Sequence, residues 1–321
     1  MGYDIIGDIH GEADKLEALL RKLGYRLGTN GYQHSGRQAI FVGDFIDKGP
    51  AQLRTINLVR QMVDSGAALA VLGNHELNAI AWHTPDPDNK KEFLRPHFSE
   101  KWGQKNRVQH IRFLEEVEHD ARLHADIVNW FRTLPLWLDL PGLRVVHACW
   151  HTGYIDWLTA RIGISRNLPD GLLPDATREP KDDKEKDTPE PSAFKAVEAL
   201  TKGLEAPLPP GVQFLDKYGI PRDRVRLRWW EPGAKTFNRL AILPHEQAST
   251  LPEADIPVHL QLTVPSDKPI FFGHYWLTGD PQVLSPTVAC VDYSAGADGP
   301  LVAYRWDGEQ ALSTKHFVQS H

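Results

Sequence analysis

The first part of the chain repeats a short apolar run followed by an amphipathic stretch. The run Tyr3–Ile6 leads to four leucines at helical spacing, which end before Gly24, namely Leu16, Leu19, Leu20 and Leu23. The run Ala39–Val42 leads to a second stripe of the same kind, formed by Leu53, Ile56, Val59 and Val63. Two strand-helix units in succession predict an α/β fold in which these strands pair in parallel.

Later apolar runs predict further strands. Ala67–Leu72 continues the rhythm, and strands return far along the chain at Leu143–Val146, Pro269–Gly273, Val288–Val291 and Leu301–Trp306. Asp307-Gly308 follows the last of these and is a turn signal, so we expect a hairpin with Ala311–Phe317. The glycine-containing segment Tyr25–Gln38 predicts another hairpin or an irregular loop.

Two long stretches interrupt this pattern. The first stretch, at about residues 80–140, contains helical segments such as Arg107–Val117, and we expect a helical insertion there. Residues of about 155–265 are expected to form a cap, within which the proline- and charge-rich segment 167–192 is predicted to be a mobile loop. A length of 321 residues suits one large domain, residues 1–321, that carries both.

Composition narrows the class of protein. Hydrophobic residues make up 41% and charged residues 24%, which are ordinary globular values. A net charge of −6 gives no general attraction to nucleic acid or to an anionic membrane, so neither is expected as a stable partner. Cys149 and Cys290 do not indicate a disulfide framework, and we find neither a signal peptide nor an apolar run of membrane-spanning length. These features predict a soluble, cytoplasmic protein.

Three clusters of candidate metal ligands follow the first three apolar runs. They are Gly7-Asp8-Ile9-His10-Gly11, Gly43-Asp44-Phe45-Ile46-Asp47-Lys48-Gly49 and Gly73-Asn74-His75-Glu76. Ligands at the carboxyl ends of parallel strands occupy the usual position of a site in an open α/β sheet. His147 and His274 each follow one of the later predicted strands and complete the set.

These residue types are suited to a pair of divalent metal ions that clamp a phosphoryl group. Asp8 and His10 can reach one ion, and Asp44 is the natural bridge to a second. Asn74, His147 and His274 supply an amide oxygen and two imidazoles to the second ion. Mixed carboxylate and imidazole ligation suits manganese, which is our first expectation, and also iron or zinc.

The order and spacing of the clusters resemble the calcineurin-like metallophosphoesterase superfamily, in particular its serine/threonine-phosphatase-like bacterial branch. Similar members are the diadenosine tetraphosphatases and the phosphatase module of polynucleotide kinase-phosphatases. The tail from Cys290-Val291-Asp292-Tyr293 to Leu301-Val302-Ala303-Tyr304 is also similar to the closing strands of that branch. The resemblance implies a central β-sandwich flanked by helices and the same six metal ligands. It leaves residues of about 80–140 and 155–265 without a counterpart.

The resemblance also implies roles for the neighbours of the ligands. His75 would act as a general acid towards the leaving oxygen, and Asp47 would orient its ring. Lys48 and Asn74 would bind the substrate phosphate, and a metal-bridging hydroxide would be the nucleophile. Lys48 departs from the arginine of serine/threonine phosphatases, because an amine lacks the bidentate fork of a guanidinium. The bulky sequence Ala148-Cys149-Trp150-His151, together with Trp276, suggests a narrow or aromatic-lined entrance.

Other chemically active residues allow a plainer interpretation. Cys149 is expected to be a small buried residue rather than a reactive thiol. Four arginines alternate between Pro221 and Trp229, so as a strand they would share one face, either as a phosphate clamp or as an exposed strand paired with Asp223 and Glu231. Five histidines without strand context are interpreted as ordinary surface or satisfied residues, namely His83, His97, His110, His119 and His124.

The function expected first is that of a dinuclear-metal phosphomonoesterase acting on phosphoprotein or small phosphate esters. The alternative is a dinucleoside polyphosphate hydrolase, of which diadenosine tetraphosphate would be the substrate. A non-catalytic metal-binding scaffold is the minor alternative, and the intact ligand set argues against it.

Overall fold

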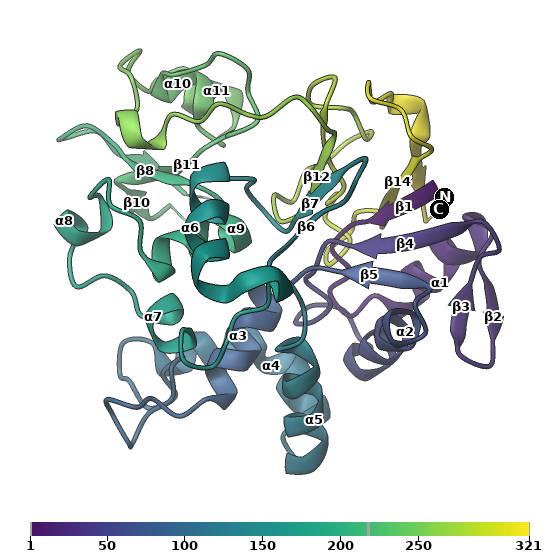
Figure 1. Cartoon of the computed structure of the whole chain (residues 1–321). Helices are drawn as coiled ribbons and strands as arrows, with labels where there is room; N and C mark the ends of the chain where they lie inside the picture. Colours follow the sequence, from purple (N-terminus) through teal and green to yellow (C-terminus); the bar gives the residue numbers. More distant parts are fainter. Residues whose placement is uncertain (1, 217–218, 321) are drawn as a thin grey trace.

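Two β-sheets form the centre of the protein, whose computed structural model describes residues 2–216 and 219–320 (Figure 1). The first sheet contains β1 (Gly2–Ile6), β4 (Arg37–Phe41), β5 (Ala68–Ala70), β14 (Val302–Trp306) and β15 (Phe317–Gln319). Its strand order is β15-β14-β1-β4-β5. The second sheet contains β6 (Trp137–Asp139), β7 (Arg144–Val146), β12 (Ile270–Phe272) and β13 (Val288–Cys290). Its order is β13-β12-β7-β6.

The two sheets pack face to face on an apolar layer. Ile5 and Ile40 of the first sheet belong to the same buried cluster as Val145, Phe271 and Ala289 of the second. Their neighbours along each strand point the other way and belong to a different cluster, as the two-residue period of a strand requires. The sandwich expected from the family resemblance is therefore confirmed.

Helices cover the outer faces of both sheets. The leucine stripe lies on α1 (Ala13–Lys22), whose Leu16, Leu19 and Leu20 are fully buried, and the second stripe lies on α2 (Gln52–Asp64). On the other side, α6 (Thr152–Ile162) and α9 (Ala193–Lys202) pack through residues that share a cluster with the outer face of the second sheet. The two predicted strand-helix units are confirmed, and β1, β4 and β5 pair in parallel.

Both predicted hairpins exist, but one has a different turn. Tyr25–Gln38 contains the antiparallel pair β2 (Arg26–Gly28) and β3 (Gly31–Gln33). The partner of β14 begins only at Phe317, so the expectation of a strand over Ala311–Phe317 directly after Asp307-Gly308 is wrong. Leu312 is buried, and its backbone N–H donates to the carbonyl of Pro286, which draws this segment out of the sheet.

The residues between β5 and β6 are mostly helical. They form α3 (Asn74–His83), α4 (Gly103–Val117) and α5 (Ala121–Phe131), and α3 packs against α5. These helices lie within the range 80–140 of the expected insertion or just before it. That this range is an insertion relative to the rest of the family stays a prediction.

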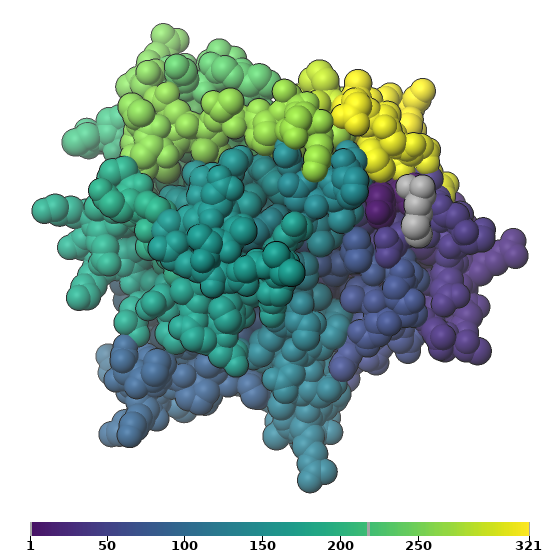
Figure 2. Space-filling model, viewed as in Figure 1, coloured from purple at the N-terminus to yellow at the C-terminus, as the bar shows by residue number. Residues whose placement is uncertain are grey.

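The range 155–265 forms a separate group of short elements, coloured teal to green in Figures 1 and 2. Besides α9 and most of α6, its α-helices are α7 (Leu173–Thr177), α8 (Asp183–Lys186), α10 (Phe237–Leu240) and α11 (His245–Ala248). Its strands are β8 (Glu205–Pro207), β9 (Phe214–Leu215), β10 (Pro221–Arg222) and β11 (Arg224–Arg226). Leu173 and Ala176 of α7 are buried, so part of the segment 167–192 packs on the protein, and its mobility stays a prediction.

Neither cysteine is bonded to the other. Cys149 and Cys290 are both fully buried, and burial raises the pKa of each thiol well above its usual value. Cys149 is thus the small buried residue that the sequence predicts. Within residues 2–216 and 219–320, the structure contains no helix with the length and apolarity needed to cross a bilayer.

The sheet topology brings the ends of several strands to one edge of the sandwich. His10, Asp44 and Asn74 follow the parallel strands β1, β4 and β5, while His147 and His274 follow β7 and β12, which are also parallel to each other. Side chains that are far apart in the sequence therefore meet beyond the carboxyl ends of the strands.

Candidate metal centre

Four ligand atoms converge around the predicted position of the second metal ion. Oδ1 of Asn74 lies 3.1 Å from Nε2 of His147 and 2.9 Å from Nδ1 of His274. Nε2 of His147 also lies 3.3 Å from Oδ2 of Asp44. Ligands that each stand about 2.1 Å from one ion are about 3.0–3.4 Å apart, so these separations suit a metal ion.

The ligands predicted for the first ion are less tightly gathered. Nε2 of His10 lies 3.8 Å from Oδ2 of Asp44, and ligand atoms of His10, Asp44 and His75 lie within 4.8 Å of one another. Asp44 belongs to this group and to the group of His147 and His274, as a bridging carboxylate would. Asp8 belongs to neither group, although its Oδ2 accepts a bond from the backbone of His274 at 2.9 Å.

The polar atoms at the predicted position of the first metal ion are suited to a cation. Oδ1 of Asp8 and Nε2 of His10 are buried and have no hydrogen-bond partner. Burial and the nearby carboxylates of Asp292 and Asp44 raise the pKa of Asp8. Burial and the neighbouring His75 lower the pKa of His10 to about 4, which leaves its imidazole neutral as a ligand must be. A divalent ion would offset the repulsion between the carboxylates and would give both buried atoms a partner.

Several side chains at the candidate metal centre lie on sharply bent backbone. Five non-glycine residues near the centre have positive φ angles, namely His10 (52°), Asp44 (52°), Asp47 (87°), His274 (73°) and Trp276 (51°). Such conformations cost on the order of 1–3 kcal/mol each and persist only where the surrounding fold enforces them. Glycine at position 73 lets the backbone approach the Asp44 carboxylate closely, because a Cβ there would lie 2.3 Å from Oδ1 of Asp44.

Glu76 holds the loop that carries Asp44, a role that the sequence analysis did not assign. Its carboxylate is fully buried and accepts the backbone N–H groups of Asp44 and Phe45, each at 2.8 Å. It also accepts the N–H of Gly73 at 3.2 Å, at the start of α3. The acidic residue three positions after a helix N-cap is a known capping signal, so the Gly73-Asn74-His75-Glu76 motif contained a hint of this role.

His75 is held by Asp47, with Nδ1 and Oδ2 2.6 Å apart. This contact directs Nε2 of His75 towards Asp44, whose Oδ2 lies 3.9 Å away. Burial opposes protonation, but Asp44 and the hydrogen bond to Asp47 raise the pKa of His75 to about 9. The other oxygen of Asp47 lies 2.7 Å from Nδ1 of His110, and the two histidines hold the pKa of Asp47 below its usual range despite burial.

Of the two interpretations given for His110 in the sequence analysis, surface or satisfied, the structure supports the second, because Nδ1 of this residue is hydrogen-bonded to Asp47. It is 1% exposed and lies on the inner face of α4. Its place in the sequence gave a usable signal, because Phe113, Leu114 and Val117 follow at the spacing of one helix face and are all buried.

The four alternating arginines do not act as one strand. Arg222 and Arg224 form ion pairs with Asp216 and with Asp187 and Glu205, which replaces the expected pairing with Asp223 and Glu231. Arg226 alone reaches the candidate metal centre. Its guanidinium donates to the carbonyl of Lys202 and lies 2.7 Å from Nε2 of His274.

The predicted phosphate-binding lysine lies at the rim of the centre. Lys48 is exposed, and its Nζ stands 6.0 Å from the ring centroid of Trp276. Trp276 stacks on His10 with centroids 4.9 Å apart, so an aromatic ring does border the site. Trp150 is buried and packs near Arg144 instead.

Comparison with known proteins identifies a family that the chain matches. The sequence profile of the family described as "Calcineurin-like phosphoesterase" matches residues 1–198. The chain is 35% identical over 162 residues to a bis(5'-nucleosyl)-tetraphosphatase PrpE [asymmetrical] of Oceanobacillus iheyensis, a match covering 50% of this chain and 60% of that protein. It is 46% identical over 165 residues to the protein of the same name in Geobacillus thermodenitrificans, covering 50% and 63%. The matches thus span less than two thirds of these relatives.

One solved structure is similar to nearly the whole chain. A serine/threonine phosphatase of Saccharomyces cerevisiae is 16% identical, with a TM-score of 0.47 over 99% of this chain and 79% of that one.

Proposed function

This chain belongs to the calcineurin-like phosphoesterase family, and from that premise we propose that it hydrolyses dinucleoside polyphosphates with two divalent metal ions. The observation that carries the two-metal chemistry is Asp44, which belongs to both candidate ligand groups. The relatives named bis(5'-nucleosyl)-tetraphosphatase support the choice of substrate. This choice puts the alternative of the sequence analysis ahead of the phosphomonoesterase.

The metal ions would be held by the six ligands predicted from the sequence, namely Asp8, His10, Asp44, Asn74, His147 and His274. When bound, they would lower the pKa of water and draw charge from the phosphate oxygens. Manganese is our first choice, with iron or zinc as alternatives.

The protein's own side chains would orient the substrate and deliver a proton. Arg226 and Asn74 lie at the second ligand group, where a guanidinium and an amide can hold phosphate oxygens. His75 would protonate the leaving oxygen from Nε2, because its Nδ1 is engaged with Asp47. Asp47 would keep the ring in that orientation.

A phosphomonoesterase is the second candidate. Lys48 is exposed at the rim, where it can meet the terminal phosphate of a phosphoprotein or a small ester. In both candidates the substrate is a phosphorylated molecule of the cell interior, in keeping with the predicted cytoplasmic location.

The test is a comparison of substrates with purified protein and manganese. We expect kcat/KM for diadenosine tetraphosphate to exceed that for a phosphoserine peptide by at least about tenfold. Faster turnover of the phosphopeptide would favour the second candidate. Absence of hydrolysis of either substrate and of p-nitrophenyl phosphate, with manganese, iron and zinc in turn, would contradict both.

A further inference from the structure

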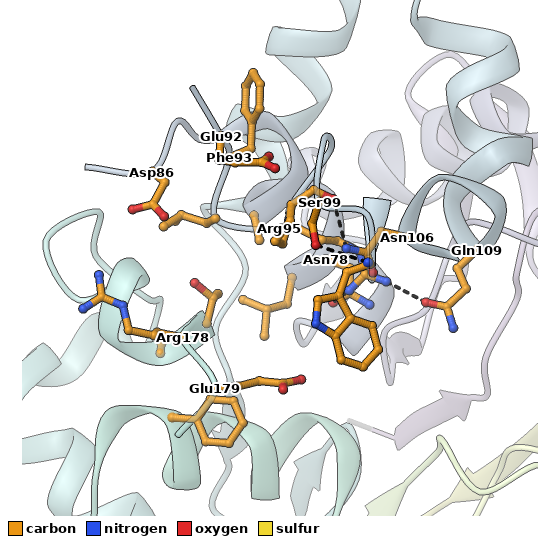
Figure 3. A pocket seen from close by; sticks show the side chains of 18 of the residues that line it. Asn78, Asp86, Glu92, Phe93, Arg95, Ser99, Asn106, Gln109, Arg178 and Glu179 are labelled. Carbon is orange, nitrogen blue, oxygen red and sulfur yellow. Dashed lines mark hydrogen bonds between the residues drawn. The ribbon is translucent and has the colours of Figure 1, made fainter. Parts of the chain in front are cut away.

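A cavity of about 640 Å³ lies beside the candidate metal centre, between the segment 86–109 and the segment 176–202 (Figure 3). Phe93, Arg95 and Trp102 line it from the first segment, and Phe194 lines it from the second. In Figure 3, Arg178 and Glu179 lie below Glu92 and Phe93 and come from the other of these two segments. Its volume is in the range of about 300–1,000 Å³ that is usual for small-molecule sites.

Two walls of this cavity continue directly from the metal centre. Asn78 lines the cavity and lies one helical turn after Asn74 on α3. Lys202 also lines it, and the carbonyl of Lys202 accepts a hydrogen bond from Arg226, which contacts His274. Neither Asn74 nor Arg226 lines the cavity itself, but each adjoins a residue that does, so the remainder of a substrate whose phosphate they hold can lie there.

Arg95 differs from the other basic residues of the lining in its partners. Its guanidinium donates to Oδ1 of Asn78 at 2.8 Å and to Oε1 of Gln109 at 2.7 Å, and its Nε is buried without a partner. In the part of the chain that the structure describes, Arg95 has amide partners but no ion pair. Burial lowers its pKa, and Asp47 is the first of the carboxylates that oppose this shift.

The other basic residues of the lining are already engaged. Arg178 pairs with Asp88, and Lys202 pairs with Glu198 at 2.8 Å. Lys105 stands 5.0 Å from the ring centroid of Trp102. A half-buried guanidinium without a counter-ion is costly, and phosphate oxygens match its fork of donors. Arg95 is thus suited to one phosphate group.

The rest of the lining favours a neutral, flat group over more phosphate. Four acidic side chains balance the four basic ones, namely Asp86, Glu92, Glu179 and Glu198 against Arg95, Lys105, Arg178 and Lys202. A polyphosphate that filled the cavity would meet these carboxylates. Trp102 and Phe194 offer ring faces on which a nucleobase can stack, an interaction worth about 1–3 kcal/mol per base, whereas Phe93 already stacks on His97 with ring centroids 4.0 Å apart.

We infer that this cavity binds the leaving nucleotide of the substrate, with Arg95 on one of its phosphates and its base against the aromatic lining. The inference rests on the proposed function, since it assigns a place to the part of a dinucleoside polyphosphate that lies beyond the cleaved bond. It makes Arg95 a specificity-determining residue for nucleotide substrates.

Arg95→Gln tests this assignment, with Arg107→Gln as the matched control because Arg107 lies on α4, outside the lining, and pairs with Glu118. The readout is the ratio of kcat/KM for diadenosine tetraphosphate to kcat/KM for p-nitrophenyl phosphate. We expect Arg95→Gln to lower this ratio about tenfold, the loss of one charged hydrogen bond, and Arg107→Gln to leave it at the wild-type value. A wild-type ratio in Arg95→Gln would overturn the inference.

Inhibition by ATP provides a second measurement that does not require cleavage of the dinucleotide. With p-nitrophenyl phosphate as substrate, ATP is expected to inhibit more strongly than inorganic tripolyphosphate, and Phe194→Leu is expected to remove this preference. Arg95→Gln is expected to weaken inhibition by ATP about tenfold. Equal inhibition by ATP and tripolyphosphate would exclude a nucleoside site.

The two experiments separate the inference from the proposed function. If the wild type fails to cleave diadenosine tetraphosphate but ATP inhibition depends on Arg95, the proposed function is wrong and the nucleotide site stands. If the wild type cleaves diadenosine tetraphosphate and Arg95→Gln changes neither the kcat/KM ratio nor ATP inhibition, the nucleotide site is wrong and the proposed function stands. If Arg95→Gln lowered phosphopeptide turnover more than it weakened ATP inhibition, the cavity would be assigned to a peptide and the inference would be overturned.

Discussion

Asp47 connects to His110 through a short contact, with its Oδ1 2.7 Å from Nδ1 of that histidine. The same carboxylate holds His75 through its other oxygen at 2.6 Å. His110 is buried on α4, so a helix outside the sandwich fixes the carboxylate that orients the proposed acid. The orientation of His75 therefore depends on how α4 packs.

The first prediction concerns His110. His110→Leu keeps the buried volume but removes the donor to Asp47, so we expect kcat for p-nitrophenyl phosphate to fall about tenfold, a usual cost for losing a group that orients a site residue. His110→Asn can place an amide N–H near the position of Nδ1 and should retain most activity. Steady-state kinetics of the two variants measure the difference.

His119→Leu is the control for His110, since His119 is exposed at the end of the same helical region. Equal kcat values for His110→Leu and wild type, with unfolding temperatures unchanged, would remove His110 from the orienting contact. A loss of kcat in His110→Asn as large as that in His110→Leu would point to packing instead.

The second prediction concerns metal content. Asp44 is 1% exposed and belongs to both ligand groups, so Asp44→Asn should reduce bound metal from about two ions per chain to one or none. Elemental analysis after gel filtration measures this directly. Asp64→Asn, at an exposed position paired with Arg60, should keep the wild-type metal content. A full complement of metal in Asp44→Asn would rule out the bridge.

The third prediction separates the arginines of β10 and β11. Arg226 contacts His274, whereas Arg222 pairs with Asp216 at an exposed position. We expect Arg226→Ala to weaken competitive inhibition by inorganic phosphate about tenfold, because a charged hydrogen bond to phosphate is lost. Arg222→Ala removes the same charge and should leave the inhibition constant unchanged. A similar effect of both variants would indicate general electrostatics rather than a contact.

The fourth prediction concerns acid stability and His151. Nδ1 of this residue accepts the backbone N–H of Tyr154 at 3.2 Å and so caps α6. Burial lowers the pKa of His151 to about 4, so the unfolded chain binds its proton first as the pH falls below about 6.5. The folded state therefore loses stability between about pH 6.5 and pH 4.

Asparagine is a good N-cap and does not titrate, so His151→Asn should match the wild type at pH 7.5 and be more stable at pH 4.5 by about 2–3 kcal/mol. Urea unfolding at the two pH values measures this difference. The prediction fails if the two proteins lose stability in parallel as the pH is lowered.

Much of the site could be predicted because its ligands follow apolar runs. His10, Asp44 and Asn74 come directly after strands, and parallel strands bring such positions to one edge without further information. The hairpin after β14 was predicted less well, because Leu312 gains more from packing beside Pro286 than from continuing the sheet.

The sequence by itself identified the family and predicted the α/β class and the candidate ligands of two metal ions, because these ligands are local to strand ends, while the sandwich followed from the family resemblance. Only the tertiary structure decided that His110 contacts Asp47 across 63 residues and that Arg226 contacts His274 across 48. It alone placed Arg95, which has no ion pair within residues 2–216 and 219–320, on a cavity beside the centre. Such contacts depend on how helices and short strands dock against the sandwich, and periodicity specifies which face of an element is buried but not which partner it meets.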